Sequence, residues 1–557
     1  MSEQIAVPKI TGSDIELGNF FYGEGGSAQQ SDYEASRLLL AMVGGSPLHP
    51  EPSDAAWLEA LNGLRRHTGA SSYGGYHSQD HGRKYLATNG GCIYIDLNHL
   101  ELASPEVTSA RDYGAVWMGM LEIARQAQAQ ANARLPDDRR IVVLANNSDR
   151  QGHSYGGHQS FLMSRTAWDE MMRRRMLPSV FILMAYQASS IVFTGQGKVG
   201  SENGEPSVPF QISQRADFIE SLVGEQTTYN RPLINTRDEA LCGSGGRHAA
   251  QSSASRDRYA RLHVIFYDTT LCPQTGYLKV GVMQLILCML EAGQLGAELV
   301  LDDPLRALHE WSRDPDFNTH MPLASGRKLT AVELQMEFLE RARKFADAGG
   351  FDAAVPGAED ILALWEDTLA KLHARNFTGL RGRLDWVLKR ALLEQALERH
   401  TDWRWDSPEL TYLDQIYSSI DPADGLFLQL LDAGCIEPVA GAADAERFAA
   451  MPPEDTRAWT RAMLLRALPA ARVRRVDWDG LEVEAEEPGG PRTHIELADP
   501  AGTTRAELEP LFAAAKNPSE LLEGLAAAGI AKTRAVANPV ASIYSVLDGY
   551  RYDYELN

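Results

Sequence analysis

Ile234-Asn-Thr-Arg-Asp-Glu239 decides the fold, together with Phe210-Gln-Ile-Ser-Gln-Arg-Ala-Asp217 before it and Arg261-Leu-His-Val-Ile265 after it. In all three stretches, charged or imidazole side chains are set among the apolar residues from which buried strands are built. Burial of a charge without a partner is costly. We therefore expect a strand-based catalytic unit in which these polar residues line a functional site.

The composition describes a large, acidic chain. It has 557 residues, with 75 acidic against 53 basic side chains and a net charge of -22. This length allows a large core and favours two domains over one. The negative charge argues against general binding to nucleic acids or to anionic membranes. We therefore expect no nucleic-acid partner.

The cysteines and the apolar runs indicate a cytoplasmic protein without a membrane partner. The five cysteines form no CxxC pair, which predicts neither a disulfide framework nor a structural zinc site: Cys92, Cys242, Cys272, Cys288 and Cys435. The segment from Met1 to Ile10 has no secretory pattern. The longest apolar run, Val180 to Phe193, is interrupted by polar residues and is too short to span a bilayer.

The pattern along the chain predicts an α+β fold with a mostly antiparallel sheet in the first half. Strands are expected from Ile10 onward and at Cys92–Leu97, Arg140–Ala145, Gln159–Met163, Ile191–Thr194 and Leu262–Tyr267. A helix is expected over Arg111–Asn132, and helical spacing returns from Thr330 to Leu397. Residues 20–90 read as an inserted mobile loop rich in Gly, Ser and His. Residues 440–450 read as a linker, which divides the chain into domains at 1–440 and 451–557.

Two groups of carboxylates are candidate metal ligands. Asp14 and Glu16 lie at i and i+2, hence on one face of a strand, where they would repel each other without a divalent cation. A solvated edge strand would explain them equally well. Asp96 follows an apolar run, and Glu101 and Glu106 come soon after it. A turn or cap role is the alternative for Asp96, but the clustering favours an oxygen-rich site for a hard cation.

A turn-rich loop, Asn146 to Gln159, contains glycines that would let its backbone approach an anion closely. His158 in this loop is a further candidate ligand, on weak evidence by itself. Gly195 to Gly200 is another glycine loop, but it lacks the spacing of a Walker or dinucleotide motif. A phosphate site therefore needs other support.

The chain resembles the Pup ligase and Pup deamidase (depupylase) family over nearly its whole length. The resemblance rests on motifs that occur in the family's order: Gly12-x-Asp14-x-Glu16-x-Gly18, Asn89-Gly…Tyr94-x-Asp96 with His99-x-Glu101 and Ser104-Pro-Glu106, Asn146-Asn-x-Asp149…Ser154-Tyr-Gly-x-His158, Ile212 to Asp217, Thr227 to Glu239, Arg261 to Ile265, Leu278-Lys-Val-Gly281, Leu384 to Lys389, Leu413-Asp-x-x-Tyr417 and Pro452 to Ala458. It implies a glutamine-synthetase-like sheet that cups ATP and Mg²⁺, with helices packed on it and a small C-terminal domain.

The resemblance also implies roles for individual residues. Asp96 takes the position of the family's catalytic aspartate. The implied metal ligands are Asp14, Glu16, Glu101, Glu106, His158 and Glu239. The implied nucleotide contacts are Arg215, Arg237, His263, Ser154 and Tyr155. Arginine suits the phosphates because its planar group binds anions through two hydrogen bonds.

Three departures from the family pattern indicate a divergent member. Asp14 stands in place of the usual first Glu, and Gln159 in place of the usual Glu after the histidine, which would remove a charge beside the metal. Residues 240–255 form a longer insertion after Glu239.

Four functions are compatible with these residues. The resemblance favours a deamidase or depupylase that acts on a small ubiquitin-like modifier, because the insertion at residues 20–90 sits where the deamidases carry an extra loop. A ligase that joins a C-terminal Glu side chain to a lysine is the first alternative. A nucleotide-binding scaffold without turnover is the second, and a small-molecule amide ligase would share the same sheet.

Overall fold

The computed structural model describes residues 7–23, 32–44, 53–67, 83–174, 178–238, 258–439, 441, 445–485 and 490–534. Glu239, the insertion at 240–255 and parts of the expected 20–90 loop lie outside these ranges. Within the described ranges, no helix has both the length and the apolar character needed to cross a membrane.

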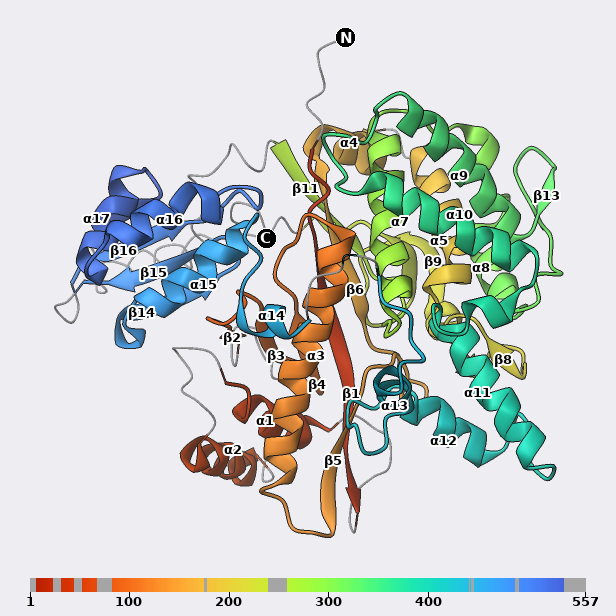
Figure 1. Cartoon of the computed structure of the whole chain (residues 1–557), viewed down its shortest axis with the longest axis horizontal. Coiled ribbons are helices and arrows are strands. Elements are labelled where there is room, and N and C mark those ends of the chain that lie inside the picture. Colours follow the sequence, from red (N-terminus) through yellow and green to blue (C-terminus); the bar gives the residue numbers. More distant parts are fainter. Residues whose placement is uncertain are drawn as a thin grey trace, which may run out of the picture.

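A seven-stranded antiparallel sheet forms the centre of the molecule (Figure 1). Its strand order is β11 (Tyr259–Val264), β6 (Gly157–Ser164), β1 (Thr11–Gly23), β4 (His99–Ala103), β3 (Cys92–Asp96) and β2 (Lys84–Tyr85), with β5 (Arg139–Leu144) paired to the second half of β1. The expected α+β class and most of the expected strands are confirmed. The strand expected at Ile191–Thr194 is wrong.

Those four residues end helix α5 (Ser179–Thr194). The helix is apolar and buried on nearly all sides, so its sequence shows no amphipathic period. A short, fully buried apolar run cannot be assigned to helix or strand from periodicity alone. The length of the run distinguishes the two, because sixteen residues is typical of a helix and too long for most strands.

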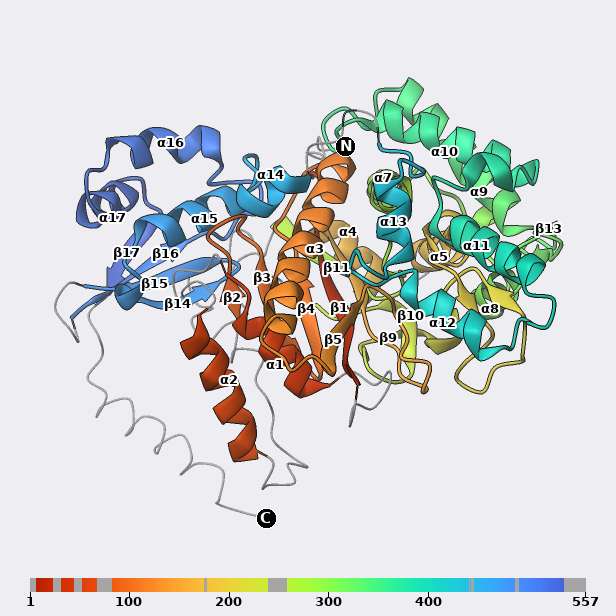
Figure 2. The same ribbon diagram turned by 60° about the horizontal axis from the view of Figure 1, so that its bottom comes forward.

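The large sheet has one apolar face and one polar face, because side chains alternate along each strand. Ile15, Leu17 and Phe161 point to the apolar face, in a core that also holds side chains of α3 (Ala110–Asn132) and α7 (Pro273–Glu291). Figure 2 shows α3 running across this side of the sheet. The opposite face carries Asp14 and Glu16 and is described below.

A group of helices packs beside the sheet and confirms the helical spacing seen from residue 330. It comprises α4 (Arg165–Asp169), η1 (Glu170–Arg174), α5, α8 (Pro304–Ser312), α9 (Ala331–Asp347), α10 (Ala358–His373), α11 (Asp385–Arg399), α12 (Pro408–Ile416) and α13 (Leu426–Asp432). Short strand pairs join them: β7 (Lys198–Val199) with β8 (Phe210–Gln211), β9 (Ile219–Gly224) with β10 (Arg231–Asn235), and β12 (Met321–Pro322) with β13 (Lys328–Leu329). Single turns of 3-10 helix occur at Ala216–Phe218, Ala297–Leu299, Phe377–Leu380 and Ala470–Arg472. Thr330 starts α9 with a capping box completed by Glu333.

The segment after β1 contains two helices within the expected inserted loop. These are α1 (Tyr33–Ala41) and α2 (Asp54–His67). Leu38 and Leu39 of α1 are buried in the main core. Between β1 and β2, the described part of this insertion is therefore helical, and α1 anchors it to the core beside the sheet.

The expected linker also contains a helix, α14 (Ala445–Ala450), which packs against α3. A Cβ added at Gly119 of α3 would lie 2.9 Å from the backbone nitrogen of Ala449. Glycine is thus required for this close contact between two helices.

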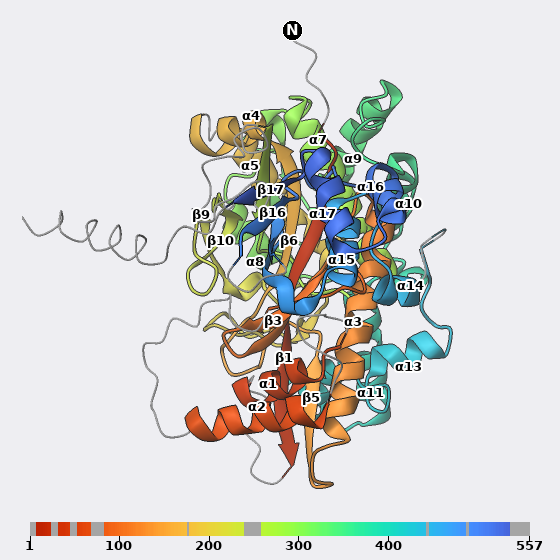
Figure 3. The same ribbon diagram turned by 90° about the vertical axis from the view of Figure 1, so that its left-hand side faces the viewer.

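The C-terminal part forms a four-stranded antiparallel sheet with three helices. The strands, in order, are β14 (Val473–Asp477), β15 (Gly480–Glu484), β16 (Arg492–Glu496) and β17 (Ala531–Arg534). The helices are α15 (Arg457–Ala467), α16 (Arg505–Ala514) and α17 (Pro518–Ala527). Figure 3, which views the molecule from this side, shows the unit in front of the large sheet.

An apolar core joins this unit to the edge of the large sheet. Tyr85, Cys92 and Tyr94 of β2 and β3 share one buried cluster with Trp459 and Trp478. The rings of Tyr85 and Trp478 meet edge to face, with centroids 5.6 Å apart.

A buried ion-pair group completes the contact. Arg457 Nε donates to Glu106 Oε1 over 2.7 Å, and Arg461 donates to both oxygens of the same carboxylate. Arg461 Nε also donates to the carbonyl of Gly90 over 2.8 Å. Burial alone would raise the pKa of Glu106, but Arg461 and Arg457 outweigh it and lower that pKa to about 2.

We predict that Glu106→Gln lowers the free energy of unfolding by about 3 kcal/mol, because it leaves two buried guanidinium groups without a counter-charge. Urea denaturation followed by tryptophan fluorescence measures the loss. Glu509→Gln removes an exposed ion pair with Arg505 and serves as the control, expected to leave the midpoint unchanged. Equal midpoints for the two variants would contradict the assignment of Glu106 as the anchor.

Candidate functional site

Three carboxylates meet on the polar face of the large sheet. Glu16 of β1 pairs in register with Glu101 of β4, so both side chains leave the same face. Asp96 ends β3 beside them. One carboxylate oxygen from each of the three lies within 4.8 Å of the others. Glu16 and Glu101, two of the expected metal ligands, thus lie beside Asp96, the expected catalytic residue.

The electrostatics of Glu101 indicate that a cation fits here. Burial raises the pKa of Glu101 well above its usual value, and the charges of Glu16, Asp14 and Asp96 raise it further. Its Oε2 is buried and has no hydrogen-bond partner among the described residues. A divalent cation would supply both the missing contact and the missing positive charge.

Asp96 is held at a tight turn between β3 and β4. It pairs with His99, which leaves Leu97 and Asn98 as a two-residue connection. His99 is positioned by a contact of its Nδ1 with the carbonyl of Leu17, 3.0 Å away. Asp96 is half-buried, whereas Glu16 and Glu101 are buried. Of the three carboxylates, Asp96 is therefore the most accessible to a substrate.

The next strands place cationic and imidazole side chains beside the carboxylates. His158 of β6 pairs in register with Asp14, and its ring lies 5.1 Å from the ring of His263 of β11. Burial lowers the pKa of both histidines, and nearby guanidinium groups, led by Arg215 for His158 and Arg261 for His263, lower it further. Both are therefore neutral at pH 7 and can act as ligands or as hydrogen-bond donors.

Arg215 lies buried at the centre of the cationic side. Burial, and then the charge of Arg231, lower its pKa to about 9. It donates to the carbonyls of Tyr155 and Ile265 and to the hydroxyl of Ser154. Its Nη2 is buried and has no hydrogen-bond partner in the described part of the chain. An unsatisfied, buried guanidinium N–H is suited to an anionic ligand.

Further residues of the expected nucleotide group lie around this arginine. Arg231 Nη2 donates to the carbonyl of Ser154 over 2.6 Å. Tyr155 contacts His99, with ring centroids 4.4 Å apart. Arg237 follows β10, and its charge contributes to the lowered pKa of both His158 and His263. Ser154, Tyr155, Arg215, Arg237 and His263 are thus brought into one region.

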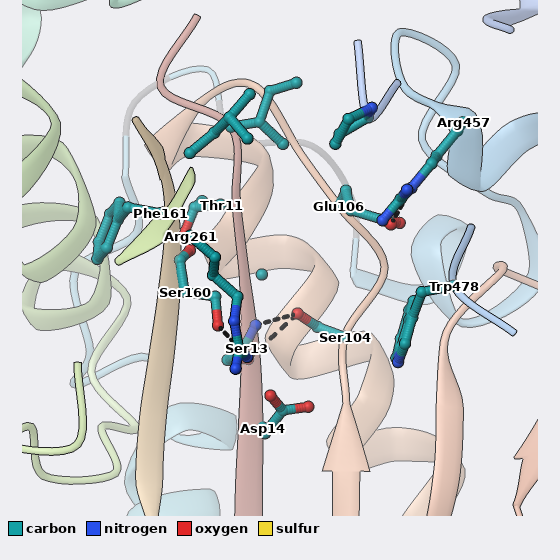
Figure 4. Close-up of a pocket in the computed structure, with 14 residues that line it drawn as sticks. Thr11, Ser13, Asp14, Ser104, Glu106, Ser160, Phe161, Arg261, Arg457 and Trp478 are labelled. Carbon is teal, nitrogen blue, oxygen red and sulfur yellow. Dashed lines mark hydrogen bonds and ion pairs between the residues drawn. The ribbon is translucent and has the colours of Figure 1, made fainter. Parts of the chain in front are cut away.

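A pocket lies between the large sheet and the C-terminal unit (Figure 4). Its cavity volume is about 80 Å³, and it is partly open to solvent. One wall is formed by Arg261, Ser160 and Leu162, and the other by Trp478 and Pro500 of the C-terminal unit.

Asp14 is at the base of this pocket, two residues from Glu16. The pocket therefore adjoins the carboxylate cluster.

Three expectations about individual site residues need correction or stay open. Glu106 is not grouped with Glu16 and Glu101; its carboxylate is occupied by two arginines of α15. Gln159 points to the opposite face of β6 from His158, where it donates to Thr11 Oγ1 over 2.7 Å, so it removes no charge beside the cluster. Glu239 lies outside the described residues.

Sequence reasoning missed some residues of the site. Arg231 and Arg261 stand within quoted motifs but received no role. The sequence could have identified both, since each is an arginine within an apolar run that forms a buried strand. Arg83 lies with its guanidinium 4.0 Å from the ring centroid of Tyr94, at the edge of the site. It had no sequence signal, because it borders a segment without clear periodicity.

Comparisons with known proteins identify the family of this chain. The family model described as Pup-ligase protein matches residues 9–482. This chain belongs to that family. The expected resemblance is thereby confirmed.

Curated relatives carry names from both branches of the family. A depupylase from Acidothermus cellulolyticus is 34% identical over 442 residues, covering 79% of this chain and 83% of the relative. A Pup deamidase/depupylase from Mycolicibacterium smegmatis is 32% identical over 440 residues, with the same coverage of 79% and 83%. A Pup–protein ligase from Acidimicrobium ferrooxidans is 33% identical over 400 residues, covering 71% and 82%.

Two solved structures share the fold. The Pup ligase PafA in complex with Pup matches with a TM-score of 0.71 at 22% identity, covering 100% of this chain and 99% of that one. PafA in complex with ADP matches with a TM-score of 0.65 at 25% identity, covering 82% and 93%. The expected fold of this enzyme family is confirmed.

We predict that Glu101→Gln stabilises the metal-free protein by about 1 kcal/mol and abolishes the stabilisation given by Mg²⁺ with ATP. The amide removes one of several repelling charges and can donate to a neighbouring carboxylate, but it is a poor ligand for the cation. Thermal unfolding with Mg²⁺ and ATP, and with ATP and a chelator, measures both effects. Glu523→Gln on α17 is the control for loss of an exposed carboxylate. A variant that keeps the wild-type response to Mg²⁺ would contradict a cation site at Glu101.

Proposed function

We propose that this protein is an ATP- and Mg²⁺-binding amidase of the depupylase type. Its substrate is a small ubiquitin-like modifier, either with a C-terminal glutamine or joined through its C-terminal side chain to a lysine. The observation that carries the proposal is the position of Asp96, whose carboxylate lies within 4.8 Å of Glu16 and Glu101 in a member of the Pup-ligase family.

The cationic side of the site supports nucleotide binding. Arg215 and Arg231 are buried, and Arg215 Nη2 has no hydrogen-bond partner among the described residues. Both ring nitrogens of His263 are likewise without one there. Phosphate oxygens would accept hydrogen bonds from the Arg215 guanidinium and from the single N–H of a neutral His263. The adjoining pocket is lined by Trp478 and Leu162, whose apolar surfaces are suited to contact with a base.

The related PafA structure contains ADP, which supports the same class of ligand.

The carboxylate cluster supports the magnesium assignment. Glu16, Glu101 and Asp14 would hold the ion from β1 and β4, with His158 beside them. When bound, Mg²⁺ would supply the positive charge that keeps Asp96 ionised and polarises the acyl oxygen.

Asp96 carries the chemistry. Its carboxylate either attacks the acyl carbon of the substrate side chain or takes a proton from the attacking water. The bond from the acyl carbon to nitrogen breaks, and a proton goes to the leaving nitrogen. Water supplies the oxygen of the new carboxylate, and ammonia or a lysine amine is released.

The hydrolytic direction is favoured by the insertion after β1, in which α1 contacts β3 and β4 and α2 packs on α1. The ligase direction is the second candidate. It is supported by the ligase from Acidimicrobium ferrooxidans, which is 33% identical and so almost as similar as the depupylase at 34%. In that direction ATP would activate the carboxylate as an acyl phosphate.

We also propose a cytoplasmic location, since Cys92, Cys272, Cys288 and Cys435 are free thiols.

We predict that Asp96→Asn lowers kcat by about a hundredfold or more while ATP binding stays close to that of the wild type. The amide keeps the shape of the side chain and removes only its basicity. Release of ammonia from a glutamine-terminated modifier measures kcat, and calorimetry measures ATP binding. Wild-type turnover in this variant would exclude the proposed role of Asp96.

The ratio of ADP to product separates the two directions. A depupylase should release ammonia or cleave the isopeptide with no stoichiometric ADP, because hydrolysis needs no energy input. A ligase should form one ADP for each bond, because amide formation from a free carboxylate must be coupled to phosphoryl transfer. One ADP per product would favour the ligase, and no product in either assay would favour a scaffold without turnover.

A further inference from the structure

The turn that follows Asp96 contains a strained leucine. Leu97 adopts φ 50°, in the left-handed region that favours glycine or asparagine. It occupies the first position of the two-residue connection between β3 and β4, since Asp96 and His99 are paired. For a leucine this conformation costs about 1 kcal/mol.

Packing does not offset this strain, because the Leu97 side chain is 66% exposed. Phe317 provides a comparison within the same chain. It has φ 57°, but its ring packs 6.0 Å from Phe377 and 5.9 Å from Trp386, measured between centroids. The strain at Phe317 is therefore compensated by packing in an aromatic cluster around the buried Trp386. Leu97 has no such compensation.

The surrounding structure holds the turn in place without using the leucine side chain. The carbonyl of Asn98 accepts hydrogen bonds from Ser36 Oγ over 2.7 Å and from Asn19 Nδ2 over 3.3 Å. Asn19 Oδ1 accepts from the backbone nitrogen of Leu100 over 3.0 Å. All these contacts involve backbone atoms of the turn, so glycine at position 97 would keep them. A strained residue that persists under such constraints is a candidate for function.

We infer that Leu97 is a specificity-determining residue that contacts the polypeptide substrate beside its reacting side chain. The inference rests on the proposed function, because it requires that a substrate side chain reaches Asp96. Adjacent residues of an extended chain are 3.8 Å apart, so a substrate held at Asp96 presents its neighbouring residues to Leu97. The expected partner group is an apolar side chain, or the apolar part of one, close to the reacting end of the modifier. Among the described residues, the Leu97 side chain is left exposed, so a bound substrate can cover it.

The test uses Leu97→Gly and Leu97→Asn in the full chain, assayed with the full-length modifier. Glycine fits the turn and removes the side chain, and asparagine fits the turn but replaces an apolar group with a polar one. We expect both variants to melt at or above the wild-type temperature and to raise KM for the modifier about tenfold, as loss of a buried leucine contact implies. We expect kcat and the affinity for ATP to change less than twofold. Met336→Ala on α9, which removes a side chain that is 40% exposed, is the control and should leave KM unchanged.

Each result distinguishes this inference from the proposed function. An active wild type together with unchanged KM in both Leu97 variants would overturn the inference alone. A fall in kcat at unchanged KM would show that Leu97 positions Asp96 and would also overturn substrate contact. A wild type that neither binds nor processes the modifier would overturn the proposed function, and the inference with it. Raised KM in Leu97→Asn as well as in Leu97→Gly would establish that apolar contact is required.

Discussion

The hydrogen-bond register of β1 is the constraint on which the rest of the structure depends. This strand pairs with β6 and β4 along its first half and with β5 along its second half. The register sets Glu16 opposite Glu101 and Asp14 opposite His158. A shift by one residue would turn these side chains into the core and would bring Ile15 and Leu17 to the polar face. The burial of the apolar face thus enforces the geometry of the site.

The polar face combines two regions of opposite charge that are each unfavourable alone. The carboxylates repel one another, and burial raises the pKa of Glu101. A few strands away, burial and the neighbouring Arg231 lower the pKa of Arg215. Such an arrangement stores electrostatic strain that a cation and an anion can relieve together. The pair of ligands that we propose, nucleotide with Mg²⁺, would provide both charges.

The C-terminal unit completes the site from outside the large sheet. Glu106 fixes α15 through Arg457 and Arg461, and the same contact sets Trp478 and Pro500 against β1 and β6. A residue that resembles a metal ligand in sequence is therefore a structural anchor in the fold. Its effect on the site is indirect, because it shapes the wall of the pocket.

The sequence by itself determined the antiparallel sheet, the helices from Thr330 onward and the positions of several polar residues that the sheet brings together. The alternation of polar and apolar residues is local, and it assigned Asp14 and Glu16 to one face. The motif order assigned the family. The sequence could not separate a buried helix from a strand at Ile191–Thr194, because a fully apolar run has no period in either form.

Only the tertiary structure decided which charged residues meet. Glu101 and Glu106 are five positions apart in the chain and look alike in the sequence, yet one joins the carboxylate cluster and the other faces two arginines more than 300 positions away. Gln159 likewise lies on the opposite face of the sheet from His158, because adjacent residues of β6 direct their side chains to opposite faces. The partners of a buried charge come from segments distant in sequence, so pairing cannot be read from local pattern. The strain at Leu97 likewise became visible only when the pairing of Asp96 with His99 left two residues to close the turn.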